Sequence, residues 1–308
     1  MTLSRYDRAI VGQVRVGVVD LGGNTARLLV ARRGPLALER IVEERVVLGL
    51  GAEIERRGRI SRSKLAAAGE TVGALHSRAL QAGCTHVEVL VTSPGRQSAN
   101  RAALERSLAC GTPKHIRFVT PDEEARLAYA GAVAGASLGS GPVAVCDVGG
   151  GSTEIAVGSP TATPRWCCSV DVGSLRVTQR HFRGGSPTKR EIREARAAVR
   201  SAFVSLEPVP TAVHALASGG TARALRKLVG HSLGADELCE AIAIASATRP
   251  QKIARRFDLP TWRAEVLLGG TIVLAEIQSL LGVPLGVATG GVREGAALAL
   301  LSHAAAAA

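Results

Sequence analysis

Two glycine-rich loops hold the residues of this chain that are best suited to chemistry. Asp20 ends one apolar run and precedes Leu-Gly-Gly-Asn-Thr, and Asp147 ends another and precedes Val-Gly-Gly-Gly-Ser-Thr-Glu. Glycines let backbone N–H groups converge on an anion without a Cβ in the way. The aspartate beside them can hold a divalent cation, directly or through water. Two such loops indicate two related halves that share a phosphate site, as in a phosphotransfer enzyme or a phosphohydrolase.

Each loop is predicted to join two β-strands. Apolar runs at 14–20 and 26–31 flank the first loop, and runs at 143–147 and 153–158 flank the second. Because 127 positions separate the two aspartates, we expect two domains of a duplicated α/β unit with a cleft between them. A single large doubly wound sheet is the alternative from pattern alone.

The remaining pattern alternates strands with helices, as in a mixed sheet covered by helices. A third apolar run at 43–50 favours another strand, and 212–216 favours a further one. Helical periodicity covers 61–83, with Ser61 as N-cap, and another helix is expected after Ser93-Pro94-Gly95-Arg96, up to about Cys110. The stretch 234–282 is almost wholly helical in pattern.

Composition indicates a globular protein that stays in the cytoplasm. Hydrophobic residues make up 46% of the 308 positions and charged residues 21%. No apolar stretch approaches the roughly 18 residues that span a bilayer. The first residues lack the apolar core of a signal peptide, so we do not expect export or membrane insertion. The six cysteines include no Cys-x-x-Cys pair, which favours reduced thiols and gives no zinc motif.

The net charge of +12 indicates an acidic partner, or simply an arginine-rich composition. Aromatic residues are only 3%, which leaves few rings to stack on bases, so nucleic acid is not the expected partner. A polyphosphorylated molecule or polymer suits the same charge.

Six separated segments, in this order, resemble the exopolyphosphatase/guanosine pentaphosphate phosphatase family. The segments are Asp20-Leu-Gly-Gly-Asn-Thr-Ala-Arg27, Thr92-Ser-Pro-Gly-Arg96, Glu123-Glu-Ala-Arg126 with Tyr129 and Gly131, Asp147-Val-Gly-Gly-Gly-Ser-Thr-Glu154, Ser218-Gly-Gly-Thr-Ala-Arg223, and Gly290-Gly-Val-Arg-Glu-Gly295. The resemblance implies an α/β fold of two actin-like domains, of the ribonuclease H-like superfamily that includes sugar kinases and Hsp70. It also implies the short two-domain form of the family, and a homodimer.

The domain boundaries follow from the same resemblance. Domain I is expected to comprise 14–120 plus 290–308, and domain II is expected to comprise 121–289.

Three segments depart from the family pattern. Gly23 stands where the first loop usually has a serine, which removes a hydroxyl donor. Pro94-Gly95 replaces a small and an aliphatic residue before the arginine, and Thr120-Pro121-Asp122 replaces the commoner Ser-Gly-x. The first change touches the phosphate loop directly.

The resemblance implies two catalytic glutamates. Glu123 corresponds to the base that orients or deprotonates the attacking water, and Glu154 to a second site carboxylate. Read locally, Thr120-Pro121-Asp122-Glu123 is also a helix capping box, so Glu123 has a structural alternative. The alternative for Glu154 is a polar residue exposed on a strand.

Metal and phosphate contacts are expected around the same segments. Asp20 and Asp147 would hold Mg²⁺ or another divalent cation, or else cap their own turns. Arg293 and Glu294 are expected to pair with each other and are left out of the catalytic set. The expected phosphate-binding residues are Gly22, Asn24, Thr25, Arg27, Arg96, Gly149, Gly150, Ser152, Thr153 and Gly220. Their hydroxyl and amide groups could instead satisfy their own turns, and Arg27 could lie on an exposed strand face.

The expected activity is the Mg²⁺-dependent release of terminal orthophosphate from inorganic polyphosphate. Hydrolysis of guanosine pentaphosphate to tetraphosphate is the alternative within the family, because both substrates present a terminal phosphoanhydride. An actin-like sugar or acetate kinase, and a weakly active regulator that binds polyphosphate or nucleotide, are alternatives from other classes.

Overall fold

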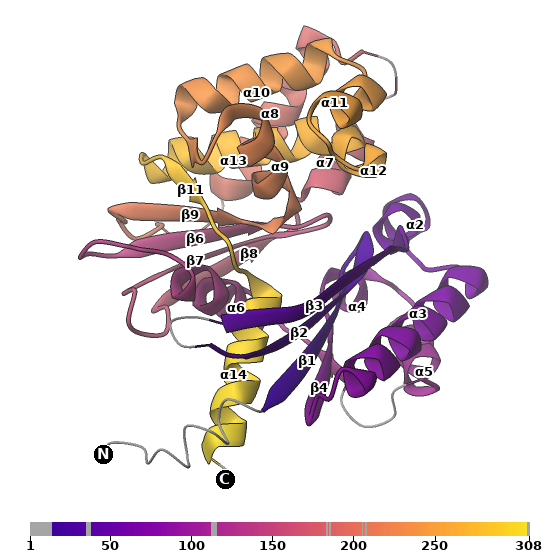
Figure 1. Ribbon diagram of the computed structural model, residues 1–308. Coiled ribbons are helices and arrows are strands. Elements are labelled where there is room, and N and C mark those ends of the chain that lie inside the picture. Colours follow the sequence, from indigo (N-terminus) through magenta and orange to yellow (C-terminus); the bar gives the residue numbers. More distant parts are fainter. Residues whose placement is uncertain are drawn as a thin grey trace. The chain divides into compact units, whose positions relative to one another are not determined.

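The computed structural model describes residues 14–34, 38–111, 116–182, 184, 186–204, 206 and 208–306. It divides into two compact units, each with its own sheet (Figure 1). Unit 1 contains the described residues up to Thr120 and those from Val292 onward, and unit 2 is Pro121–Gly291. The alternative of one continuous sheet is therefore wrong, while the expected cleft stays a prediction.

Unit 1 is built on a five-stranded sheet in the order β3-β2-β1-β4-β5. Its strands are β1 (Arg15–Leu21), β2 (Thr25–Arg33), β3 (Leu38–Val47), β4 (His86–Val91) and β5 (Ile116–Phe118). The first three strands pair antiparallel, and β4 and β5 continue the sheet in parallel. The apolar residues from Val16 to Val19 are fully buried although their side chains alternate between the two faces, so both faces of β1 are covered.

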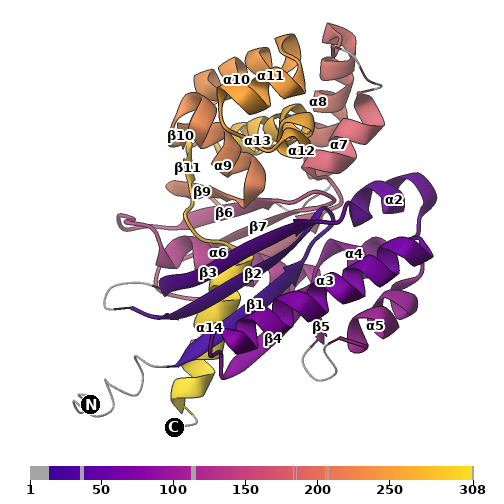
Figure 2. The ribbon, with the colours of Figure 1, turned by 45° about the vertical axis from the view of Figure 1, so that its right-hand side comes forward.

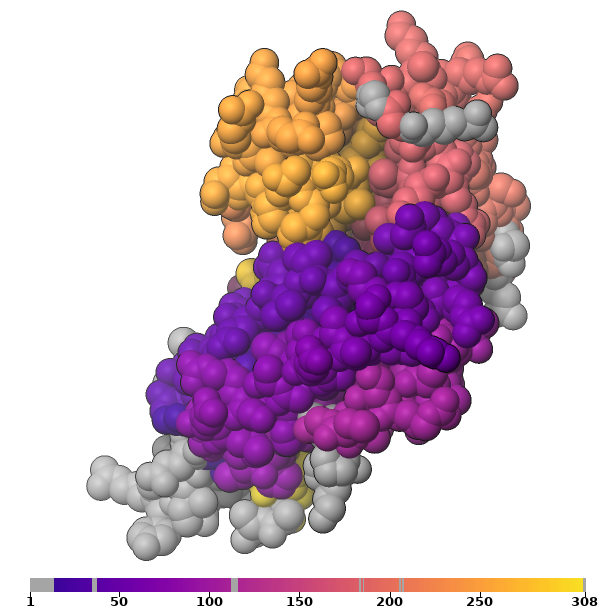
Figure 3. Space-filling model, turned by 90° about the vertical axis from the view of Figure 1, so that its right-hand side faces the viewer, coloured from indigo at the N-terminus to yellow at the C-terminus, as the bar shows by residue number. Residues whose placement is uncertain are grey.

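The helices of unit 1 cover its sheet and carry its loops. They are α2 (Leu50–Arg57), α3 (Arg62–Gln81), α4 (Ser93–Gln97), α5 (Arg101–Ala109) and α14 (Val292–Ala306). Ser61 caps α3 as expected, because its side chain accepts the Lys64 N–H. Helix α3 packs on β1 and β2 and shows its other face to solvent (Figure 3). Helix α14 also contacts β1 and β2.

Unit 2 is built on a six-stranded sheet in the order β10-β11-β9-β6-β7-β8. Its strands are β6 (Val143–Val148), β7 (Thr153–Gly158), β8 (Trp166–Val170), β9 (His214–Ser218), β10 (Ser232–Leu233) and β11 (Leu285–Val287). Helix α6 (Pro121–Ala134) packs on one face, where Ala125 and Tyr129 meet Val143 and Val145. The other helices lie over the opposite face (Figure 2): α7 (Ser174–His181), α8 (Lys189–Val204), α9 (Gly219–Val229), α10 (Ala235–Ala247), α11 (Pro250–Arg256), α12 (Thr261–Glu265) and α13 (Leu267–Leu281).

The two sheets share one topology. The order β3-β2-β1-β4-β5 in unit 1 corresponds to β8-β7-β6-β9-β11 in unit 2, with the same parallel and antiparallel pairs. The hairpin registers also match, since Asp20 pairs with Arg27 and Asp147 pairs with Glu154, both 127 positions later. The duplicated α/β unit expected from the spacing of the aspartates is therefore present.

Three expected elements differ from the structure. The strand at 43–50 ends at Val47, and α2 begins at Leu50. The helix expected after Arg96 begins only at Arg101, as α5, and Ser93–Gln97 forms the separate short helix α4. The strand expected at 212–216 begins at His214. The stretch 234–282, expected to be almost wholly helical, forms α10, α11, α12 and α13, so that prediction is confirmed. Within the described residues, no helix is both long and apolar enough to cross a membrane.

Candidate functional site

The two glycine loops make the same turn. In the first loop the Gly22 N–H donates to the Thr25 carbonyl at 3.0 Å, and in the second the Gly149 N–H donates to the Ser152 carbonyl at 3.0 Å. The two donors, Gly22 and Gly149, are 127 positions apart in sequence, and so are the two acceptors. Each turn therefore closes its hairpin directly after the aspartate-bearing strand.

A helix N-terminus anchors the second loop. The Ser174 N–H donates to the Gly149 carbonyl at 2.9 Å, and the Leu175 and Arg176 N–H groups donate to the Gly150 carbonyl at 3.0 and 3.1 Å. These N–H groups have no acceptor within their own helix, so the loop satisfies them. The approach is close enough that a Cβ on Gly173 would lie 2.5 Å from the Gly150 carbonyl.

The first loop is anchored in the same way by the start of α2. The Asn24 carbonyl accepts N–H groups from Leu48 and Gly49 at 2.9 and 3.0 Å, and the Gly23 carbonyl accepts the Gly51 N–H at 2.5 Å. The loop carbonyls of both units are thus turned toward helices. Among the described contacts, the N–H groups of Gly23, Asn24 and Gly150 have no acceptor, which leaves them for an anion.

Four polar side chains form a row across the sheet of unit 2. Ser218, Asp147, Glu154 and Ser169 are register neighbours on β9, β6, β7 and β8. Glu154 is 2% exposed, so it is not an exposed strand residue, and its Oε1 accepts the Ser169 hydroxyl at 2.9 Å. Two carboxylates directly opposite each other in an antiparallel pair repel.

The corresponding row in unit 1 has a different charge pattern. Asp20 pairs with Arg27, and Arg27 pairs with Arg45 on β3. Arg27 is half-buried, and its Nε donates to the Thr25 Oγ1 at 3.2 Å. The row of unit 1 thus presents two arginines beside its aspartate. Arg45 and Ser169 were not among the expected site residues, because only the strand register aligns them with Arg27 and Glu154.

Thr153 and Ser152 are buried at the end of the second loop. The Thr153 hydroxyl donates to the Val172 carbonyl at 2.5 Å, and the residue has no exposed surface. A hydroxyl has one proton to donate, so this contact favours the structural alternative for Thr153 over phosphate binding. Ser152 is 2% exposed.

Arg96 lies in α4, directly after β4. It is half-buried, and its Nη1 donates to the Val119 carbonyl at 3.1 Å. The preceding Gly95 packs against Phe118, whose ring carbon lies 2.5 Å from where a Cβ would be. The Phe118 ring therefore fills the space of the aliphatic side chain that is usual at position 95.

The residues at the start of α9 lie next to the row of polar side chains in unit 2. Gly219 has a φ of +91°, and a Cβ there would lie 2.8 Å from the Asp147 Oδ1. The Ser218 Oγ, next to Asp147 in the row, is buried without a hydrogen-bond partner. Gly220 lies beneath the Arg263 guanidinium, which also stacks on the Trp262 ring at 4.6 Å. Arg263 is a second cation that sequence reasoning did not single out.

Glu123 lies in the first turn of α6 and is half-buried. The helix begins at Pro121, as the capping box predicts, so the capping and catalytic interpretations both stay open. Two other residues of its motif dock the helix on the β7–β8 hairpin. Arg126 Nη1 donates to the Pro164 carbonyl at 2.9 Å, and the Tyr129 hydroxyl donates to the Ser159 carbonyl at 2.7 Å.

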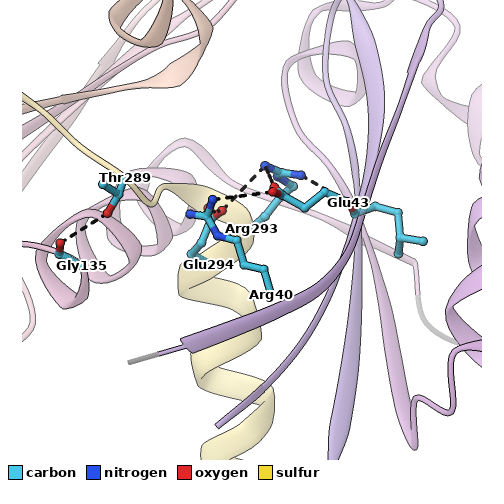
Figure 4. Close-up of polar contacts among 7 residues, drawn as sticks. Arg40, Glu43, Gly135, Thr289, Arg293 and Glu294 are labelled. Carbon is cyan, nitrogen blue, oxygen red and sulfur yellow. Dashed lines mark hydrogen bonds and ion pairs between the residues drawn. The ribbon is translucent and has the colours of Figure 1, made fainter. Parts of the chain in front are cut away.

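The last motif contributes to the packing of unit 1. Arg293 Nη2 lies 3.7 Å from Glu294 Oε1, so the expected pair is confirmed, and it extends to β3 (Figure 4). Arg40 Nη2 contacts the largely buried Glu294 at 3.1 Å, and Arg293 Nη2 contacts Glu43 at 3.3 Å. This network holds the start of α14 on the sheet. In unit 2, the Thr289 hydroxyl donates to the Gly135 carbonyl at 3.3 Å.

The donor set suits a hard divalent cation. Asp20 and Asp147 are both half-buried at the loop ends of β1 and β6, and Mg²⁺ is usually held by one or two carboxylates with water and substrate phosphates. Each unit therefore offers one carboxylate that fits Mg²⁺. Within the described residues, no three His, Cys, Asp or Glu side chains form a cluster that could hold a metal by themselves.

Comparisons with known proteins point to one family. A family model described as the Ppx/GppA phosphatase family matches residues 29–304. Exopolyphosphatase 2 of Mycobacterium tuberculosis is 31% identical over 293 residues, covering 85% of this chain and 89% of that protein. The guanosine-5'-triphosphate,3'-diphosphate pyrophosphatase of Aeromonas hydrophila is 24% identical over 297 residues, covering 92% of this chain and 59% of that protein.

A solved structure shares the whole fold. The crystal structure of an exopolyphosphatase from Cytophaga hutchinsonii matches with a TM-score of 0.84 at 19% identity, covering 94% of this chain and 98% of that one. The α/β fold of two units that was expected from the sequence is confirmed.

The role of Thr153 can be tested through stability. Thr153→Val keeps the shape of the side chain but leaves the buried Val172 carbonyl without its donor. We expect the free energy of unfolding to fall by about 1–3 kcal/mol, measured by denaturant unfolding of the full chain. Thr153→Ser keeps the hydroxyl and should stay closer to the parent than Thr153→Val. Equal stability of Thr153→Val and the parent protein would contradict the structural role.

Proposed function

Because this chain belongs to the Ppx/GppA phosphatase family, we propose that it releases terminal orthophosphate from inorganic polyphosphate by attack of water. Its relatives named exopolyphosphatase and pyrophosphatase are phosphoanhydride hydrolases, and the chain is an enzyme of that class. Guanosine pentaphosphate hydrolysis is the second candidate, because a relative named as a guanosine-5'-triphosphate,3'-diphosphate pyrophosphatase aligns with 92% of this chain. The kinase alternative has no support among these relatives.

One observation carries the proposal: the buried Glu154 beside Asp147, directly after the second glycine loop. Phosphoryl transfer to water needs an oriented water molecule and neutralisation of the transferred group. The Ser169 hydroxyl holds the Glu154 carboxylate in one orientation. Glu154 can then accept a hydrogen bond from the attacking water.

Glu123 is proposed as the base that takes the proton of that water. Its half-buried position in the first turn of α6 is compatible with an acceptor that reaches beyond its own helix. The loss of a positioned base typically costs about 10²–10⁴-fold in rate.

The cations and N–H groups of the loops would neutralise the substrate. Arg27 and Arg96 supply positive charge, and the N–H groups of Gly23, Asn24 and Gly150 have no acceptor among the described contacts. Such preorganised donors stabilise charge that develops on the transferred phosphoryl group. Gly220, at the positive end of α9, would bind a further phosphate.

Asp20 and Asp147 would hold Mg²⁺ through their carboxylate oxygens. The bound cation would supply charge neutralisation on the phosphate oxygens. The absence of a Cβ at Gly219 leaves room for the Asp147 carboxylate.

The cellular setting belongs to the same proposal. All six cysteines are free, and burial raises the pKa of the Cys146 thiol to about 12, so it stays a protonated core residue. Reduced thiols of this kind support a cytoplasmic enzyme. A homodimer, and a substrate other than nucleic acid, are proposed from the family resemblance and the low aromatic content.

The assay that tests the function follows phosphate release by the full chain with Mg²⁺. Polyphosphate and guanosine pentaphosphate are compared at equal concentration of terminal phosphate. Faster release from polyphosphate supports the proposal, and faster release from guanosine pentaphosphate selects the second candidate. Tight calorimetric binding of polyphosphate without turnover would instead identify a regulator, as Gly23 in the phosphate loop allows.

Glu123→Gln is expected to lower kcat by about 10²–10⁴-fold. Glutamine keeps the shape and a capping acceptor but cannot take a proton, so folding and KM should change little. The matched control is Glu240→Gln, an exposed residue of α10. Retained turnover with a lowered melting temperature would show that helix capping was the whole role of Glu123.

Ser169→Ala tests the positioning of Glu154. Loss of one hydrogen bond to a charged group should lower kcat by about tenfold or more while KM stays nearly constant. Ser169→Thr keeps the hydroxyl and should restore most of the rate. If Ser169→Ala lowers only thermal stability, or if threonine gives no rescue, the serine does not act through Glu154.

A further inference from the structure

One serine in the row of unit 2 lacks a contact that its counterpart has. The row runs Ser218, Asp147, Glu154 and Ser169 across β9, β6, β7 and β8, so each carboxylate has a serine on its outer side. Ser169 donates its hydroxyl to Glu154 Oε1 at 2.9 Å. Ser218 is fully buried, and its Oγ has no hydrogen-bond partner in the part of the chain that the structure describes. The two ends of the row thus differ by one hydrogen bond.

An unpaired hydroxyl is unfavourable at this position. A buried polar group without a hydrogen bond has lost its hydration and gained nothing in return. Native proteins pair nearly all such groups, and the exceptions are often tied to catalysis or to a bound ion. The hydroxyl of Ser218 therefore indicates a contact that forms in another state of the site.

Helix capping does not use this hydroxyl. Ser218 is the N-cap residue of α9, and a serine there ordinarily accepts a hydrogen bond from an N–H group of the first turn. Its backbone is extended, with φ −102° and ψ 179°, as is usual for an N-cap residue, but its side chain makes no capping hydrogen bond. A purely structural role at the start of the helix is thus not what keeps a serine here.

The other buried hydroxyl at this end of α9 is explained by packing. Thr221 is also fully buried, and among the described residues its Oγ1 has no hydrogen-bond partner. Its side chain packs so closely on Gly270 of α13 that a Cβ at position 270 would overlap it. Thr221 therefore belongs to the contact between α9 and α13.

The Asp147 carboxylate is within reach of the Ser218 hydroxyl. The two residues are register partners on parallel strands, and adjacent strands lie about 4.8 Å apart. Both side chains point to the face covered by α6, because Val145 and Leu216, two residues earlier on the two strands, belong to the cluster that packs α6 on the sheet. Asp147 Oδ1 also lies beside Gly219, where a Cβ would be 2.8 Å away. Rotation of either side chain can therefore bring the hydroxyl and the carboxylate together.

We propose that Ser218 is a positioning residue for the cation site. When a divalent cation is bound, its hydroxyl donates to the oxygen of Asp147 that does not hold the cation. Carboxylates that hold a metal are themselves hydrogen-bonded by a neighbouring group, which fixes their orientation. Serine suits this role, because its hydroxyl has one proton to donate and carries no charge that would compete with the cation. The inference rests on the proposed metal role of Asp147 and adds a residue to it.

A direct contact between Ser218 and a substrate phosphate is the competing assignment. The hydroxyl could donate to a phosphate oxygen as well as to a carboxylate. However, Ser218 has no exposed surface, whereas Asp147 is half-buried, so a ligand that arrives from solvent meets the carboxylate first. Burial thus favours the carboxylate as the acceptor.

The test measures Mn²⁺ binding to the full chain by electron paramagnetic resonance, without substrate. Ser218→Ala should raise the Kd for Mn²⁺ by about tenfold or more, as the loss of a hydrogen bond to a metal ligand typically does. The melting temperature of the metal-free variant should not fall, because in that state the hydroxyl has no hydrogen bond to lose. A structural hydroxyl would give the opposite pair of results.

Thr221→Val is the matched control, because it removes the other unpartnered buried hydroxyl at this end of α9 and keeps the shape of the side chain. It should bind Mn²⁺ like the parent protein. A metal-free melting temperature that Ser218→Ala lowers and Thr221→Val does not would overturn the inference. Unchanged Mn²⁺ binding by Ser218→Ala together with weaker calorimetric binding of inorganic phosphate would assign the hydroxyl to the substrate and also overturn it.

Asp147→Asn separates this inference from the proposed function. It should weaken Mn²⁺ binding more than Ser218→Ala does, because it removes the charge of the ligand itself. Parent-like binding by Asp147→Asn would contradict the proposed metal role of Asp147, and the inference would fall with it. Weak binding by Asp147→Asn with parent-like binding by Ser218→Ala would overturn the inference alone.

Discussion

Hydrogen bonds between glycine-loop carbonyls and helix N-termini fix the geometry on which the candidate site depends. In unit 2 the carbonyls of Gly149 and Gly150 accept the first N–H groups of α7, and in unit 1 those of Gly23 and Asn24 accept N–H groups at the start of α2. Each helix satisfies donors that its own backbone cannot, and each loop gains one orientation. With the carbonyls turned toward the helices, the remaining N–H groups of the loops can converge on phosphate.

The two duplicated units share this arrangement of loop and helix, but they differ in the charge of the residue paired with the aspartate. Asp20 and Asp147 occupy equivalent positions, whereas their antiparallel partners are Arg27 and Glu154. Unit 1 thus offers a cation at the position where unit 2 offers a buried carboxylate held by Ser169. A hydrolase needs both, since the phosphate must be neutralised and the water oriented. The antiparallel partner of the aspartate is therefore a position at which the two units differ in charge.

At two positions where this chain lacks the usual side chain of the family, a side chain from a neighbouring residue lies close by. A Cβ at Gly23 would lie 3.3 Å from the Oγ of the buried Ser93, so a serine hydroxyl stands beside the position that lost one. At Gly95 the missing aliphatic group is replaced by the Phe118 ring. These contacts keep both segments packed, which explains why the fold tolerates the changes.

The sequence by itself determined the duplicated hairpins, because strand periodicity, glycine turns and the carboxylates at Asp20 and Asp147 are local signals. It did not determine α2, since Gly49 and Gly51 disfavour a helix until the first loop accepts their N–H groups. Nor could the sequence show that the Thr153 hydroxyl donates to the Val172 carbonyl. It therefore gave no reason to leave Thr153 out of the phosphate-binding set. Ser169 and Arg45 became visible only through strand register, which tertiary structure decides because pairing joins residues far apart in the chain.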